Sequence, residues 1–122
     1  MDKFTSEEAA LIIKNSKAII NYLKTEIAPK LRTTRHFAFP FERGTKDLRL
    51  SIYPTSSSPI TLSRGHGYEF QPQPNEYDYF FSDKNLREQM ALINNWASVK
   101  KQLLSQIEAD QSELNALHNF EL

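Results

Sequence analysis

Turn-forming and aromatic residues are concentrated in one central stretch of this chain, and that distribution constrains its fold more than any other feature. Ten of the fourteen aromatic residues, all three glycines and five of the six prolines lie between Phe37 and Phe81. Neither Pro nor Gly occurs before Pro29 or after Pro74. Because Pro and Gly disfavour helix interiors, the sequence predicts two long helices that flank a compact, aromatic β-unit.

The length, charge and composition of the chain exclude several classes of protein. The chain has 122 residues, which predicts a single domain over 1–122. Fifteen basic and fifteen acidic residues cancel, which weakens the case for nucleic acid or an anionic membrane as partner. The absence of Cys excludes disulfides and thiolate chemistry. No apolar run approaches the length of a membrane span, and the N-terminal segment does not resemble a signal peptide. We therefore expect a cytoplasmic protein that binds no membrane.

The first helix is predicted over about residues 5–28. Thr5 and Glu8 form a capping-box pattern at its start. Ile12, Ile19 and Leu23 then recur at helical spacing and define one apolar stripe. Pro29 disfavours helical geometry in the preceding residue, so the helix is expected to end or kink there.

The central β-unit is predicted over about residues 36–81, because apolar residues there alternate with polar ones. Pro40 cannot donate a hydrogen bond to a neighbouring strand, so the first strand is expected at a sheet edge or with a bulge. The pattern predicts an antiparallel meander of three to five strands, one face of which packs on helices. The alternating residues are Phe37, Phe39 and Phe41; Leu48, Leu50 and Ile52; Ile60 and Leu62; Tyr68 and Phe70; and Tyr77, Tyr79 and Phe81.

The second helix is predicted over about residues 83–118. An unbroken helix of this length would measure roughly 50 Å, whereas a domain of this size is about 35 Å across. The helix must therefore break, near Asn94 and Asn95 or at Ser105, or project beyond its own domain. Its apolar stripe comprises Leu86, Met90, Ile93, Trp96, Leu103, Ile107, Leu114 and Leu117. The resulting fold class is α+β, with the long C-terminal helix packed on the sheet and on the first helix.

The C-terminal part of that stripe predicts self-assembly. The first helix is too short to cover the whole length of the second, so the last apolar residues need another partner. We expect a homo-oligomer, most simply a homodimer, with an interface formed by Leu103, Ile107, Leu114 and Leu117.

A second surface is suggested by arginines and aromatic residues of the β-unit. Arginine and aromatic side chains on a sheet can hold single-stranded nucleic acid by phosphate contacts and base stacking. The alternative is that the aromatic side chains form the core while the arginines lie on the solvent face, and the slight negative charge of residues 37–82 favours it. The candidate partner-binding residues are Arg43, Arg49, Arg64, His66, Tyr77, Tyr79 and Phe80.

No pattern in the sequence points to catalysis. The three histidines, His36, His66 and His118, lie far apart and have no carboxylate pair at metal-ligand spacing. The Arg64 to Gly67 turn lacks the lysine and the following helix of a phosphate-binding loop. We therefore expect no catalytic residue, no metal and no cofactor. A small metal-free nuclease that uses His66 and nearby arginines is the remaining enzymatic alternative.

These observations favour a non-enzymatic interaction or accessory protein. It would assemble through its C-terminal helix and bind a macromolecular partner, a protein rather than nucleic acid, through the β-unit. Small proteins without cysteine or a catalytic motif are often accessory proteins of phages or mobile elements, so we expect such an origin. No particular residue of the sequence indicates it. A single-stranded nucleic-acid-binding module is the alternative function.

Overall fold

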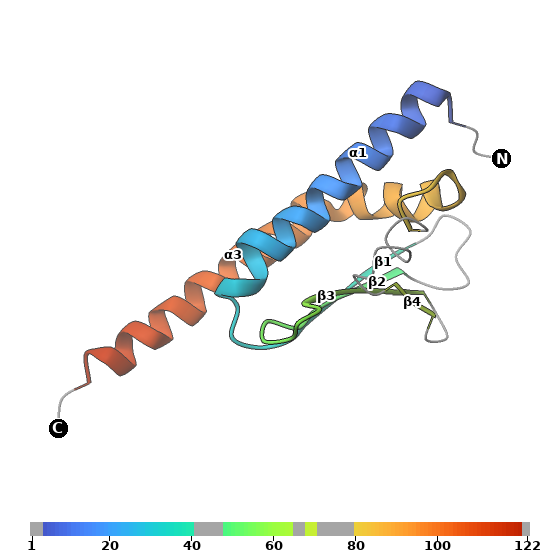
Figure 1. Ribbon diagram of the computed structural model, residues 1–122. Helices are drawn as coiled ribbons and strands as arrows, with labels where there is room; N and C mark the ends of the chain where they lie inside the picture. Colours follow the sequence, from blue (N-terminus) through green and yellow to red (C-terminus); the bar gives the residue numbers. More distant parts are fainter. Residues whose placement is uncertain (1–3, 41–47, 65–67, 71–79, 121–122) are drawn as a thin grey trace.

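The predicted order of helix, sheet and helix is confirmed by the computed structural model, which describes residues 4–40, 48–64, 68–70 and 80–120 (Figure 1). The protein is an α+β fold in which two helices pack against one small antiparallel sheet. In chain order the elements are α1 (Ser6–Tyr22), the π-helical turn η1 (Leu23–Ile27), the 3-10 turn η2 (Ala28–Lys30), β1 (Arg35–Phe39), β2 (Leu48–Ile52), β3 (Ile60–Arg64), β4 (Tyr68–Phe70), the 3-10 turn η3 (Asp83–Asn85) and α3 (Leu86–His118).

The start of α1 carries the predicted capping box. The backbone N–H of Glu8 donates to Thr5 Oγ1 at 3.1 Å, and the N–H of Thr5 donates to Glu8 Oε1 at 2.8 Å. After Tyr22 the α-helix gives way to the π-helical turn η1 and then to the 3-10 turn η2, which ends at Lys30. Pro29 is tolerated there because it lies in the first turn of η2, where its missing N–H costs no helical hydrogen bond.

The four strands form a meander in the order β1-β2-β3-β4, and each neighbouring pair is antiparallel. The expectation that the first strand lies at a sheet edge is confirmed. Side chains paired across the strands share a face, so the register defines an inner face and an outer face. The inner face is mainly apolar and packs against the helices, and the register also places Arg35 on it, opposite Ile52. Its apolar residues are Phe37, Phe39, Leu48, Leu50, Ile52, Ile60 and Leu62.

The predicted fifth strand is not found at its described residues. Phe80 is helical and Phe81 lies in a turn that leads into η3, while residues 77–79 lie outside the described part of the chain. Both rings are buried, and they meet edge-on with centroids 5.0 Å apart. Consecutive residues of a strand point to opposite faces, whereas this turn allows both rings to enter the one core.

Helix α3 is unbroken over 33 residues, a length of about 50 Å. Of the two alternatives that the sequence left open, a break at Asn94 and Asn95 or at Ser105 is therefore absent, and the helix projects. It runs parallel to α1: Ser16 bonds to Gln89, Tyr22 meets Trp96, and Arg32, beyond η2, bonds to Asp110. Figure 1 shows that α3 continues well past the end of α1.

The residues that α3 buries differ in part from the predicted stripe. Leu92, Val99 and Leu103 are buried in the core. Leu86, Met90 and Ile93 are only half-buried, because they lie at the side of the contact with α1 and the sheet.

Candidate functional site

The projecting end of α3, defined here as residues 111–120, is the first candidate surface. In the described structure most of its side chains are exposed, and only Leu114 among them is half-buried. Leu117 is 64% exposed and Phe120 is 70% exposed. A large apolar side chain gains about 1.5–3 kcal/mol when it is fully buried, so this end favours a further contact.

The apolar residues of the projecting end continue the side of α3 that packs on its own chain. Leu117 follows the buried residues Leu103 and Asp110 at steps of seven, and Leu114 follows the half-buried Ile107 at the same step. Residues seven apart lie almost above one another on a helix. Leu114 and Leu117 therefore extend the buried stripe beyond the last point at which the rest of the chain covers it.

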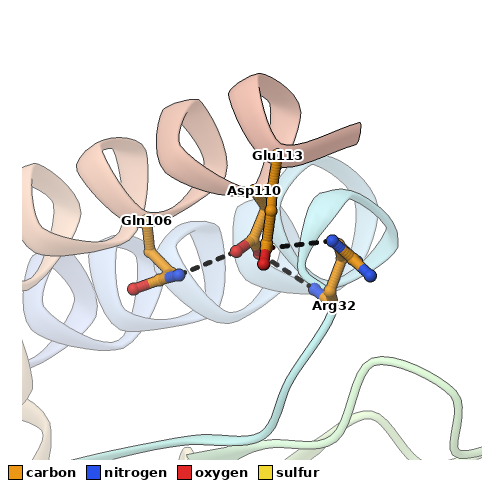
Figure 2. A network of polar contacts seen from close by, with 4 residues as sticks. All are labelled: Arg32, Gln106, Asp110 and Glu113. Carbon is orange, nitrogen blue, oxygen red and sulfur yellow. Dashed lines mark hydrogen bonds and ion pairs between the residues drawn. The ribbon is translucent and has the colours of Figure 1, made fainter. Parts of the chain in front are cut away.

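That last point is a polar cluster that we call the Arg32 corner: Arg32, Gln106, Asp110 and Glu113 (Figure 2). The backbone N–H of Arg32 donates to Asp110 Oδ2 at 3.1 Å, and the Gln106 side-chain amide donates to Asp110 Oδ1 at 2.8 Å. The Arg32 guanidinium bonds to Glu113 Oε2 at 3.0 Å. These contacts tie the segment that leaves η2 to α3, so the projecting end begins at a fixed place.

The outer face of the sheet is the second candidate surface, and apart from Ala38 its residues with described side chains are polar. His36, Ser51 and Thr61 are paired across β1, β2 and β3, and Arg49 is exposed beside them. Ser51 Oγ lies 2.9 Å from His36 Nδ1. The His36 ring meets the Tyr53 ring edge-on at a centroid distance of 6.2 Å. Tyr53, at 37% exposure, follows β2 and is held at one end of this row.

A hollow of about 400 Å³ lies beside Tyr53, where β2 ends and β3 begins. Hydroxyl groups dominate its lining, and none of the residues that form it is acidic or basic. The polar groups that these described residues offer are therefore mainly hydroxyls. The lining residues are Thr34, Tyr53, Pro54, Thr55, Ser56, Ser58 and Thr61.

The candidate partner-binding residues do not form one described group. Arg49 is exposed on the outer face of the sheet. Phe80 is completely buried in the core, so its expected role as a surface contact is contradicted. Arg64 pairs with Tyr68 across β3 and β4, but its side chain is not described. The other candidates, Arg43, His66, Tyr77 and Tyr79, lie outside the described residues.

The four residues predicted to form an oligomer interface divide into two pairs. Leu103 is fully buried in the core of its own chain, and Ile107 is packed against that core. Leu103 is therefore covered by its own chain and unavailable to a second copy. Leu114 and Leu117 lie on the projecting end, where nothing else in the described structure covers Leu117.

The described residues contain no group of three or more side chains able to hold a metal ion. His36 lies in β1 and His118 ends α3, while His66 lies outside the described part. No helix within the described ranges is both long and apolar enough to cross a membrane.

Three comparisons of this chain with known proteins give no match. No family model matches the chain, and no similar protein is found among curated sequences or among solved structures. The functional argument therefore rests on this chain's own surfaces.

Two buried polar residues of α3 were missed as contact residues by sequence reasoning. Gln89 is completely buried, accepts a hydrogen bond from Ser16 Oγ at 2.6 Å and donates to the backbone oxygen of Ser82 at 3.0 Å. Asp110 is only 5% exposed. Both lie a multiple of seven residues from Leu103, so the helical spacing indicated that they share its face of α3. The spacing does not show which residue each of them contacts.

Proposed function

We propose that this chain is a non-enzymatic interaction protein that assembles with a second copy of itself through the projecting end of α3. The observation that carries the proposal is the continuation of the packing stripe into Leu114 and Leu117, beyond the Arg32 corner. The projecting end of this 33-residue helix also exposes large apolar side chains, Leu117 and Phe120, which favours a further contact.

The positions of the described aromatic residues of β1 favour a protein partner over nucleic acid. The described aromatic residues of β1, Phe37 and Phe39, pack against the core instead of forming a stacking platform for bases. Arg49 is the exposed arginine of β2, next to neutral Ser51. In the proposed assembly, His36 and Arg49 of the outer face of the sheet remain exposed on each copy for a protein partner.

Light scattering coupled to size-exclusion chromatography tests self-assembly. We expect a dimer mass at tens of micromolar for the native chain and a monomer mass for Leu117→Glu. A buried glutamate in an apolar interface would have to lose its hydration shell, whereas Leu117 is exposed in the single chain and its replacement should leave the fold intact.

Leu11→Glu is the matched control. Leu11 on α1 is 58% exposed, close to the 64% of Leu117, but lies far from the projecting end. This variant should remain a dimer, with an unchanged circular dichroism spectrum. A monomer mass for the native chain at all concentrations, with intact fold, would contradict the proposed function.

A further inference from the structure

We infer that the two projecting ends pair antiparallel, with a two-fold axis between Leu114 and Leu117, and that each helix end lies against the Arg32 corner of the other copy. This inference rests on the proposed function and adds the orientation of the pair. In this arrangement Leu114 of one copy faces Leu117 of the other, twice.

Sterics favour the antiparallel orientation. The side of α3 that carries Leu114 and Leu117 is the side that, further upstream, is covered by α1, η2 and the sheet. A parallel partner helix continued upstream along that side would occupy the space of this chain's own core (Figure 1). An antiparallel partner helix enters from the free end and overlaps only residues 111–118, about 12 Å of helix.

Charge favours the same orientation. The C-terminal end of a helix carries a partial negative charge from its unpaired carbonyl groups. Antiparallel pairing places this end beside Arg32, whose side chain is 40% exposed and paired with Glu113 of its own chain. Lys30, two residues earlier, is 59% exposed and paired with Glu26. Parallel pairing would bring the two negative helix ends together, along with the two Glu113 carboxylates, which are 69% exposed.

The chain has no native cysteine, so single cysteines can carry spin labels without background. We choose Ala97→Cys and Asn115→Cys, both at exposed positions of α3. Ala97 lies about 28 Å along the helix from the proposed axis. Pulsed electron–electron double resonance should therefore give a distance of about 55 Å between the two Ala97 labels. The Asn115 labels should lie close together, near the interaxial distance of about 10 Å lengthened by the label arms.

The readouts separate this inference from the proposed function. A dimer mass with a long distance at Ala97 and a short one at Asn115 supports the antiparallel pair. A dimer mass with an Ala97 distance well below about 40 Å overturns the orientation and leaves the assembly itself in place. A dimer mass with a long distance at Asn115 overturns pairing through the projecting ends. A monomer mass without dipolar coupling overturns both.

Discussion

Asp110 shows how one polar residue can occupy a position within an apolar stripe and still be satisfied by hydrogen bonds. Its carboxylate is buried, but it accepts hydrogen bonds from the Arg32 backbone and the Gln106 side chain. Asp110→Ala leaves the Arg32 N–H unpaired in a partly buried place, and an unsatisfied group of this kind costs about 1–3 kcal/mol. We expect a loss of that size in the free energy of unfolding, measured with urea on the Leu117→Glu background so that assembly does not contribute.

Glu113→Ala is the control for that measurement within the same cluster. The Glu113 side chain is 69% exposed, and its contact with Arg32 is a surface ion pair, a kind worth about 0–1 kcal/mol. It should therefore cost less than Asp110→Ala. Equal losses for the two variants would mean that the corner is held by the ion pair and not by the backbone hydrogen bond.

At the residue scale, local patterns were predictable and tertiary partners were not. The capping box of Thr5 and Glu8 depends on residues three apart, so the sequence contains the whole interaction. The contact between Ser16 and Gln89 joins residues 73 positions apart, and no local spacing encodes it. Phe80 was a candidate for a partner contact or for the core because a strand was expected around it, and in the structure its ring is buried.

Within α3, the packed part and the projecting end should differ in local stability. Leu92, Val99 and Leu103 are buried, whereas most residues of 111–118 are exposed. Isolated helical turns are marginal in water, and exposed helix ends open easily. Amide hydrogen exchange in the Leu117→Glu monomer should therefore be at least about 100-fold faster in residues 111–118 than in residues 92–103.

The native chain provides the comparison for that experiment. Pairing of the projecting ends should slow exchange in residues 111–118 as the protein concentration rises, and should leave residues 92–103 unchanged. Equal protection of both segments in the monomer would show that the projecting end is stabilised within a single chain.

At the element scale, the sequence predicts helices and strands from the spacing of their apolar residues, but it does not predict features that depend on packing. Both helices, the β2 alternation and the edge position of β1 follow from spacing and from Pro40. The choice between a broken helix and a projecting one was open, because Asn94, Asn95 and Ser105 tolerate both outcomes. The structure shows the projecting helix: Asn95 remains inside α3 and donates its side-chain amide to the carbonyl of Ala91, one turn earlier in the same helix, at 2.8 Å.

At the scale of the whole molecule, the fold was predictable and the function was not. The apolar residues of the β-unit had to be covered by two helices, which leads to the α+β arrangement. A function requires side chains from different elements to meet, and the described outer face of the sheet brings together hydroxyl groups, His36 and Arg49 without a charged cluster. What distinguishes this molecule is its shape, a helix longer than the body that supports it.

That shape leads to a thermodynamic prediction for the intact chain. A partner that binds only the folded state stabilises it by mass action, so the unfolding temperature of a dimer rises with protein concentration. We expect Tm of the native chain to rise between 2 and 200 μM, about a 100-fold range, and Tm of Leu117→Glu to stay constant. Because the chain has no net charge and the proposed interface is formed by leucines, this rise should persist in roughly 0.5 M salt, where exposed charges are largely screened. A concentration-independent Tm for the native chain, or a rise abolished by salt alone, would show that Leu114 and Leu117 do not hold two copies together.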